Sequence, residues 1–307
     1  MIFDFYASLD KSKACPKQAN EASLASGFVD GCTFWSCRGG EKNNARQCYM
    51  KRTTGLKEDI LNFPDGLTLD TDFTRLPDTT WFGLSVSFTL KSPWYSKDDH
   101  PFHVLDNPVH KDRVFGVPFM SAASWKGLLR WACRMQAGLF AHLKTHDMKM
   151  NDWKDPPWIV HLFGNEKEEQ NDLRFGTLVF YPTWFNKIGF EVINPHSRTL
   201  RAGTQPIYCE VVPAGTKGRL RLLYAPVPGE IERDKVKPTD FIDSLINSIT
   251  ALLETYGISA KRTAGWGTAK IDDNGWRLHP DNGSNIKTAD DVVREIKGRF
   301  TPQGGDQ

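Results

Sequence analysis

FGLSVSFTL, residues 82–90, alternates large apolar side chains with Gly, Ser and Thr. A period of two places the apolar side chains on one face, which is typical of a strand with one buried side. Later in the chain, Ser121 and Ser124 can cap a helix whose apolar positions repeat about every 3.6 residues. A second apolar stripe follows Pro238 and reaches the stop signal Gly257. These patterns predict a sheet with helices on one face.

The remaining elements complete an α+β pattern. Strands are predicted at 178–181, 207–212, 220–224 and 267–271, and a short helix at 156–162. The order strand, helix, strand, strand, optional strand, helix, strand is that of a ferredoxin-like (RRM-type) sheet covered by two helices. We therefore predict this core over residues 81–272, after an irregular extension over 1–80 and before a peripheral tail over 273–307.

Composition is that of a folded chain. Its 307 residues include 39 Lys and Arg against 37 Asp and Glu, and the net charge of +2 excludes a histone-like electrostatic wrapper. No apolar run approaches the ~18 residues of a membrane span, and residues 1–4 carry no secretory signal. We expect a cytoplasmic protein without a membrane partner, whose thiols are reduced or bound to metal.

The cysteines of the extension allow two hypotheses. They are Cys15, Cys32, Cys37 and Cys48. Four thiolates can hold a tetrahedral Zn²⁺ ion, which stabilises small segments that have little apolar mass. The alternative is unrelated reduced thiols, because the set lacks a CxxC pair. Cys133 and Cys209 are predicted as small core residues, and His161 as a packing histidine.

Cations gather at the start of the first predicted helix, close to Ser124. Lys126 and Arg130 are four residues apart and share a face, which Arg134 extends. Together with the unsatisfied N–H groups of the first turn, this face suits a phosphate backbone. A solvated basic face explains the same spacing equally well.

A glycine-rich segment, residues 257–267, carries Lys261, Arg262 and Trp266 between a helix and a strand. Glycines let a backbone approach a ligand closely, the two cations neutralise phosphate, and the indole can stack on a base. An ordinary turn is the alternative interpretation.

Several segments together resemble the signature of the RAMP superfamily, the backbone subunits of type III CRISPR effector complexes. They are Gly116-Val117-Pro118-Phe119-Met120, Ser124-Trp125-Lys126-Gly127-Leu128-Leu129-Arg130, Leu162-Phe163-Gly164, Asn194-Pro195-His196-Ser197-Arg198-Thr199 and Gly265-Trp266-Gly267. The likeness covers about residues 81–272. In one departure, Ser121-Ala122-Ala123-Ser124 stands where the family usually has Pro-Gly-Ser-Ser.

The resemblance implies a subunit that grips guide RNA, stacks on like subunits and faces paired target RNA in a Csm/Cmr-like complex. It also implies that the segment beginning at Asn194 belongs to a β-hairpin thumb. Arg198 and Arg201 on such a hairpin suit a phosphate or heteroduplex contact. Binding would involve mainly phosphates and 2′-hydroxyls, because such a subunit must accept any spacer sequence.

The loop Asp106-Asn107-Pro108-Val109-His110-Lys111-Asp112 is similar to the family loop that carries the aspartate needed for target-RNA cleavage. Asp106 is the positional match, with His110 and Lys111 as assistants. A carboxylate can hold a divalent ion such as Mg²⁺ or act as general base toward the 2′-OH. Alternatively, Asp106 only caps a turn before Asn107-Pro108.

Three functions stay open at this point. The first is a guide-RNA-binding backbone subunit with metal-dependent target-RNA cleavage at Asp106. The second is a non-catalytic architectural or end-capping subunit. The Asn194-Pro195-His196 motif also resembles the corresponding motif of the end-capping subunit. The third is a free-standing RNA-processing endonuclease, which is disfavoured because no His lies between Gly257 and Ile271.

Overall fold

The computed structural model describes residues 50, 73, 75–98, 105–112, 117–165, 174–194, 206–280 and 286–301. Almost all of the predicted N-terminal extension lies outside these ranges, together with several predicted site residues. Those residues are Cys15, Cys32, Cys37, Cys48, Arg198 and Arg201.

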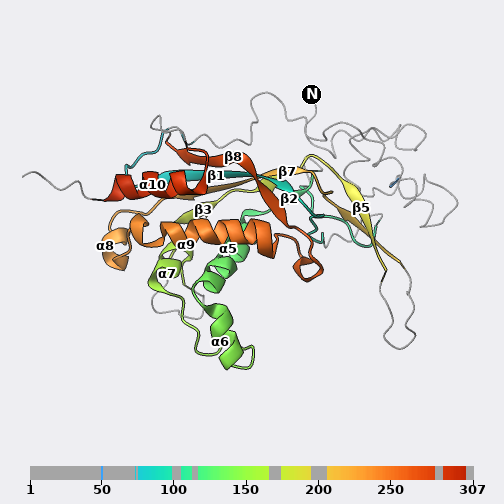
Figure 1. Ribbon diagram of the computed structural model, residues 1–307, viewed down its shortest axis with the longest axis horizontal. Helices are drawn as coiled ribbons and strands as arrows, with labels where there is room; N and C mark the ends of the chain where they lie inside the picture. Colours follow the sequence, from blue (N-terminus) through green and yellow to red (C-terminus); the bar gives the residue numbers. More distant parts are fainter. Residues whose placement is uncertain are drawn as a thin grey trace, which may run out of the picture.

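A four-stranded antiparallel sheet forms the centre of the protein (Figure 1). Its order is β3-β7-β1-β8, with β1 at Phe82–Leu90, β3 at Leu178–Phe180, β7 at Lys217–Tyr224 and β8 at Ala269–His279. The apolar side chains of β1 are at most 2% exposed, as its alternation predicts. In the register, Leu84 lies opposite Leu222 on one side and Leu278 on the other, so one apolar face runs across the sheet.

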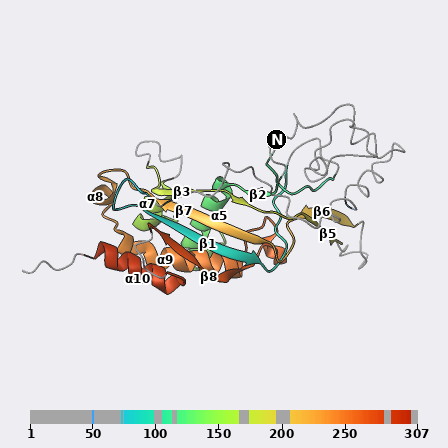
Figure 2. The same cartoon turned by 90° about the horizontal axis from the view of Figure 1, so that it is seen from above.

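The long helices α5 and α9 cover this apolar face, as Figures 1 and 2 show from two directions. Helix α5 spans Ala122–Gln136 and α9 spans Pro238–Ala251. Trp125 of α5 meets Phe88 edge-on, and Phe241 of α9 lies 5.3 Å from Tyr224 between ring centroids. The core is therefore a single layer of side chains between sheet and helices.

The first predicted helix is divided at Gly138. After α5, a shorter helix α6 spans Leu139–Thr145, and Gly138 between them has φ of 101°. This left-handed conformation suits glycine and ends the first helix, whereas the apolar period continues across it. The other short helices are α7 (Pro157–Phe163) and α8 (Glu230–Asp234). None of the helices within the described ranges is both long and apolar enough to cross a membrane.

Two smaller strand pairs extend from the sheet. Strand β2 (Phe119–Met120) pairs with β4 (Thr183–Trp184), and β5 (Gly189–Ile193) pairs with β6 (Ile207–Val211). The β5–β6 pair projects away from the helices in Figure 1. Its base is joined to the core because Trp94 and Val212 exchange two backbone hydrogen bonds of 2.9 Å.

The C-terminal part differs from the prediction of a peripheral tail. Strand β8 continues to His279, so the predicted boundary between residues 272 and 273 falls inside it. Helix α10 (Ala289–Phe300) then packs on α9, and its Val292 and Ile296 are fully buried. The register of β8 shifts between the partners of Val86 and Phe88. This irregularity interrupts the alternation of apolar and polar residues along β8. The sequence pattern therefore did not predict the second half of the strand.

We predict that Ile296→Ala lowers the free energy of unfolding by about 2–4 kcal/mol, because it leaves a cavity in the core. Arg294→Ala, on the exposed side of the same helix, should change it by less than about 0.5 kcal/mol. Urea denaturation of the full chain measures both. Equal effects of the two variants would show that α10 is peripheral after all.

Candidate nucleic-acid interface

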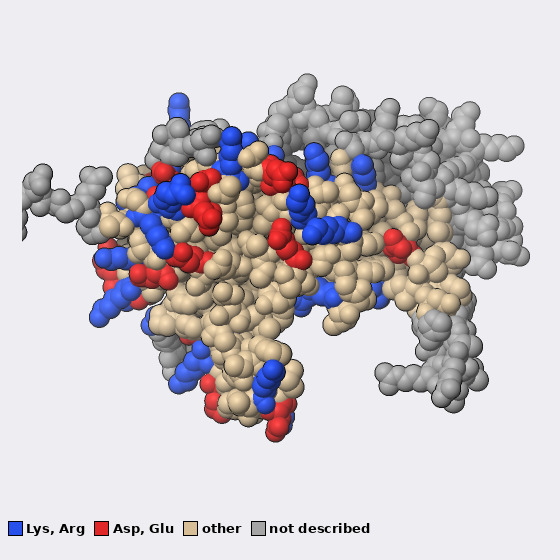
Figure 3. Space-filling view, viewed as in Figure 1, with Lys and Arg blue, Asp and Glu red and all other residues tan. Residues whose placement is uncertain are grey.

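Lysine, arginine and carboxylate side chains are mixed on the side of the molecule drawn in Figure 3. No uniform basic patch marks a site in this view. The pairing of each cation therefore decides which of them are available to an anionic ligand.

The start of α5 is a capped helix terminus. Ser121 is the N-cap, and its Oγ accepts a hydrogen bond of 3.1 Å from the backbone N–H of Ser124, which is exposed. Trp125 anchors the first turn because its Nε1 donates to Thr183 Oγ1 over 2.9 Å. The first turn carries no acidic residue, so nothing in it opposes an approaching anion. Ser121 thus caps the helix in the segment Ser121-Ala122-Ala123-Ser124, which stands where the family usually has Pro-Gly-Ser-Ser.

Lys126 lies on the second turn of α5 and is half-buried. Its pKa is lowered by burial and, to a smaller extent, by the nearby charge of Arg130. No residue of the described ranges forms an ion pair with Lys126. Neutralising this ammonium by a phosphate would relieve the repulsion that Arg130 exerts.

The glycine-rich segment is held against the end of β1. Tyr95 accepts a backbone hydrogen bond of 2.8 Å from Ala260, and Ser259 Oγ accepts one of 3.0 Å from the Tyr95 N–H. Gly257, with φ of 78°, lets the two arms of the segment meet: a Cβ there would lie 2.8 Å from the Trp266 carbonyl oxygen. The glycines therefore serve the fold of this loop directly.

The cations of this loop rest on aromatic rings. Lys261 Nζ lies 5.8 Å from the ring centroid of Tyr95, and the guanidinium of Arg262 lies 4.5 Å from that of Trp131 on α5. Burial lowers the pKa of Arg262. Trp266 meets Tyr95 edge-on at 6.4 Å and is half-buried. The Arg262–Trp131 contact brings two predicted RNA-binding segments together that are far apart in the sequence.

Arg130 and Arg134 occupy a different position from the one predicted for them. Both bind Asp155: Arg130 Nη2 lies 2.7 Å from its Oδ2, and Arg134 Nε lies 2.7 Å from its Oδ1. The Asp155 side chain is only 5% exposed, and Trp153 donates a further hydrogen bond to it. These contacts fasten the segment before α7 to α5. We therefore revise the role of the two arginines from phosphate ligands to structural partners of Asp155.

Asp106 lies exposed on a loop that is fastened to β6. Glu210 of β6 donates its backbone N–H to the Asn107 carbonyl over 3.0 Å and accepts a hydrogen bond from the Val109 N–H through its own carboxylate. The backbone on the C-terminal side of Asp106 is thus held by a strand of the projecting pair. The Asp106 side chain is exposed on this anchored loop.

The two predicted assistants of Asp106 differ in their surroundings. Lys111 is buried and forms an ion pair of 2.6 Å with Glu210, in which both side chains are fully buried. Burial lowers the pKa of Lys111, and the charge of Glu210 opposes this effect. Lys111 therefore cannot reach a substrate in this structure, and we assign it to anchoring of the loop. His110 is 37% exposed and lies 4.0 Å from Asp98, so it stays within reach of solvent.

The residues around Asp106 provide only part of a metal site. In the ranges that the structure describes, no group of three or more His, Cys, Asp or Glu side chains is placed to hold an ion. Mg²⁺ commonly takes one or two carboxylates together with substrate phosphates and water. Asp106 fits the role of a single protein ligand in such a shared site, and the zinc hypothesis stays a prediction.

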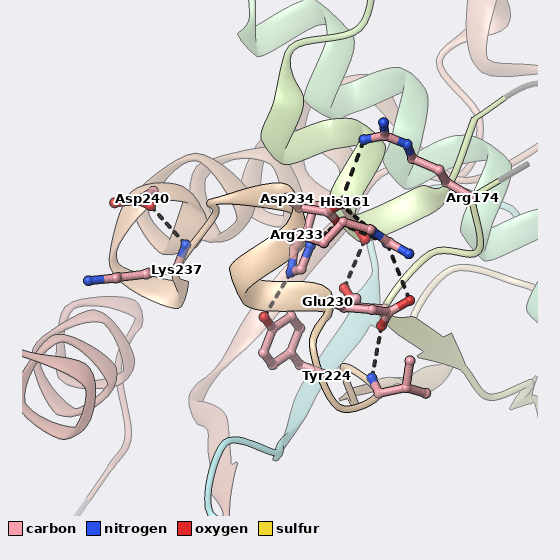
Figure 4. Close-up of polar contacts among 10 residues, drawn as sticks. His161, Arg174, Tyr224, Glu230, Arg233, Asp234, Lys237 and Asp240 are labelled. Carbon is pink, nitrogen blue, oxygen red and sulfur yellow. Dashed lines mark hydrogen bonds and ion pairs between the residues drawn. The ribbon is translucent and has the colours of Figure 1, made fainter. Parts of the chain in front are cut away.

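His161 lies in a second polar cluster, shown in Figure 4. Its Nδ1 is 2.7 Å from Asp234 Oδ2 and its Nε2 is 2.9 Å from the Tyr224 hydroxyl, so both ring nitrogens have partners. Arg233 also binds Asp234 over 2.8 Å. The cluster joins α7, β7 and α8 inside the protein. This confirms the prediction that His161 is a packing residue, and Cys133 and Cys209 are buried as predicted.

Sequence patterns missed the residues that organise this interface. Trp131 and Tyr95 support the loop cations, but neither stands in a motif, and Asp155 is remote from the arginines it binds. The sequence around Glu210 offers a weak indication of its role. Glu210 is a carboxylate in a strand that is otherwise apolar, and a buried carboxylate requires a partner.

The comparisons with known proteins identify the family. The model of the RAMP superfamily matches residues 87–270, so the chain belongs to this superfamily. A search of curated protein sequences gives no significant match.

Solved structures of CRISPR complexes contain similar chains. One belongs to the type III-B Cmr-beta complex bound to cognate target RNA, at 14% identity over 65% of this chain and 61% of that one, with a TM-score of 0.42. Another comes from the Csm3–Csm4 subcomplex of the type III-A interference complex, at 16% identity over 71% and 95%, with the same score. A third, from a CRISPR RNA-guided surveillance complex, has 16% identity over 63% and 67%, again at 0.42. The chain thus spans about three fifths of the length of the Cmr-beta chain.

We predict that Asp155→Asn destabilises the protein by about 1.5–3 kcal/mol at pH 7, because charged hydrogen bonds to two arginines are lost. Burial raises the pKa of Asp155, but hydrogen bonds from Arg134, Arg130 and Trp153 outweigh this and lower it overall. A carboxyl group whose pKa is lowered by folding stabilises the folded protein at a pH above its unfolded-state pKa of about 3.9. This stabilisation is lost as the pH falls through the folded-state pKa.

The difference in unfolding free energy between wild type and Asp155→Asn should therefore narrow below about pH 4. Denaturant titrations from pH 7 to pH 3 measure it, with Asp152→Asn, an exposed neighbour, as the matched control. The assignment is wrong if both variants show the same dependence on pH.

Proposed function

We propose that the chain is a guide-RNA-binding backbone subunit of a type III CRISPR ribonucleoprotein. Membership of the RAMP superfamily and the motifs along residues 116–130 and 265–267 support this proposal. Its partners would be guide RNA, paired target RNA and neighbouring RAMP subunits, together with the other subunits of the effector complex.

The proposal rests on the contact between α5 and the glycine-rich segment. The guanidinium of Arg262 lies 4.5 Å from the Trp131 ring centroid and so joins the two segments that carry Ser124, Lys126 and Lys261. Within the described ranges, Lys126, Lys261 and Arg262 have no carboxylate partner. Cations without a carboxylate partner, near a helix start that carries no acidic residue, are suited to phosphate groups.

We expect these residues to contact the sugar-phosphate backbone of RNA rather than its bases. Ser124, Lys126 and Lys261 offer hydroxyl and ammonium donors, which contact phosphates and 2′-hydroxyls of any nucleotide. Trp266 is half-buried against Tyr95, so a stacking contact would use only its accessible edge or face. Affinity should accordingly depend strongly on salt and weakly on sequence.

The core supports the ferredoxin-like assignment within this proposal. The four strands lie in the order β3-β7-β1-β8 across the sheet. Helix α5 lies between β1 and β3 in the chain, and α9 lies between β7 and β8, so the two helices form the crossovers. The β5–β6 pair is the counterpart of the expected thumb. Arg198 and Arg201 belong to the connection between these strands and are proposed to contact the heteroduplex there.

We infer a role for Asp106 in cleavage of target RNA. Cleavage requires a deprotonated 2′-OH aligned with the scissile phosphate, and stabilisation of the charge that develops on that phosphate. The Asp106 carboxylate can accept the proton or hold a metal ion that is shared with the phosphate. Glu210 and Lys111 hold its loop in position, and exposed His110 can assist proton transfer. The non-catalytic, architectural subunit is the alternative that the cleavage experiment distinguishes.

The RNA-binding surface is tested by the double variant Lys126→Glu/Lys261→Glu. We expect the dissociation constant for a labelled single-stranded RNA to rise at least about tenfold, and the salt dependence to weaken. Lys144→Glu/Lys149→Glu on and after α6 makes the same change in charge at exposed positions. Fluorescence anisotropy of the full chain measures both variants, and equal affinities would contradict the assignment.

Cleavage is tested with Asp106→Asn in the assembled complex. We expect the cut in bound target RNA to slow at least about 100-fold while guide RNA stays bound, because the general base or metal ligand is lost. Glu191→Gln on β5 is the control for loss of a carboxylate near the projecting strand pair. Unchanged cleavage would leave Asp106 as a turn residue of a non-catalytic subunit.

A further inference from the structure

Among the described residues, no helix covers the second face of the central sheet. Figure 2 looks onto this side, with α5 and α9 behind the strands. Here β1 presents its small residues, among them Ser85, Ser87 and Thr89. A sheet face of small polar side chains leaves its neighbours on the flanking strands accessible from this side.

Cations stand on both sides of this row of hydroxyls. On β7, Lys217 lies opposite Thr89, Arg219 opposite Ser87 and Arg221 opposite Ser85. On β8, Lys270 lies opposite Thr89 and Arg277 opposite Ser85. We call this surface the basic sheet face, and define it by its exposed members and the hydroxyls between them. They are Lys217, Arg219, Lys270, Arg277, Ser87 and Thr89.

The spacing of these side chains follows from strand geometry. Alternate residues of one strand repeat every ~6.6–6.8 Å, and neighbouring strands lie ~4.8 Å apart. On β7, Lys217 and Arg219 are therefore ~6.7 Å apart, whereas Lys270 and Arg277 of β8 face β1 positions four residues apart, across the register shift. Ser87 lies between the two strands, and Thr89 donates its hydroxyl to Asp272. Cations on both flanking strands can contact an extended chain of anions.

Positive charge predominates on this face. Strands β1 and β7 contain no Asp or Glu. Strand β8 places two carboxylates nearby: Asp272 accepts a hydrogen bond of 2.7 Å from Thr89, and Asp273 pairs with Lys270 at 3.3 Å. Lys217 and Arg277 form no ion pair with any residue of the described ranges. Figure 3 shows cations projecting from the upper side of the sheet, close to an acidic group.

The aromatic side chains that the structure describes on this face lie at its other end. Phe73 covers Gly83 there and contacts Tyr181 and His279 at 5.5 and 5.7 Å between ring centroids. Between the cations, β1 contributes Ser87 and Thr89, which offer no ring for a base to stack on. Phosphate contacts without base stacking are what this arrangement supports.

We propose that the basic sheet face is a second nucleic-acid contact, which binds the phosphate backbone of single-stranded RNA. It lies on the side of the sheet opposite α5, so it is separate from the surface around Lys126 and Lys261. The inference rests on the proposed function, because both surfaces serve an RNA-binding subunit. Cations exposed on both flanking strands suit a polyphosphate chain, and two of them, Lys217 and Arg277, form no ion pair with any described residue.

The test compares three double variants of the full chain by fluorescence anisotropy with labelled single-stranded RNA of mixed sequence. Lys217→Glu/Arg277→Glu changes the basic sheet face, Lys126→Glu/Lys261→Glu changes the first surface, and Lys144→Glu/Lys149→Glu is the control. We expect the sheet variant to raise the dissociation constant about tenfold, and to reduce the slope of log affinity against log salt by about 1.4 for two lost contacts.

Different outcomes separate this inference from the proposed function. If the sheet variant binds RNA like the control while Lys126→Glu/Lys261→Glu binds weakly, the inference is overturned and the proposed function stands. If the wild-type chain binds no RNA, both are overturned. If the wild-type chain binds polyglutamate more tightly than single-stranded RNA of the same charge and the sheet variant loses this preference, the face belongs to an acidic protein segment and the inference is again overturned.

Acetylation of exposed lysines in the wild-type chain, with and without RNA, makes the result independent of the folding of any variant. Protection of Lys217 and Lys270 by RNA would support the proposal. Protection found only at other lysines would overturn it.

Discussion

Burial of one face of β1 is the constraint on which the structure depends. Strand β1 lies between β7 and β8, so its register sets both flanking strands at once. A slip of one residue would turn Leu84 and Val86 to the opposite face and expose the core. Close packing adds to this: a Cβ on Gly218 would lie 2.5 Å from the ring of Phe88. The same register places the cations of the flanking strands on the side away from the helices.

The end of β1 organises the candidate interface. There the chain passes through Trp94 and Tyr95, which bind the hairpin base at Val212 and the glycine-rich segment at Ala260. The buried pair Lys111–Glu210 joins the Asp106 loop to the same hairpin. Removing one partner of such a pair would leave a charge buried without compensation, which makes the pair a strong local restraint. Segments distant in sequence therefore reach the interface through a few buried polar contacts.

Periodicity predicted most of the helices and strands, because burial of one face leaves a period of two or about 3.6 in the sequence. Prediction from periodicity failed where the backbone geometry interrupts a regular helix or strand. Gly138 divided one predicted helix, and the irregular register of β8 concealed the strand that leads to α10. The motifs located Ser124, Lys126 and the segment around Lys261, but no pattern along the chain shows which carboxylate a cation will meet.

The sequence by itself determined the class of fold, the superfamily and the position of the glycine-rich segment, since these follow from local periodicity and short motifs. Tertiary structure alone decided the use of each charge. Asp155 binds Arg130 and Arg134, and Lys111 is buried against Glu210, whereas Lys126 has no carboxylate partner among the described residues. The physical reason is that Coulomb energy depends on distance and burial, and both are set by contacts between residues that the chain order separates.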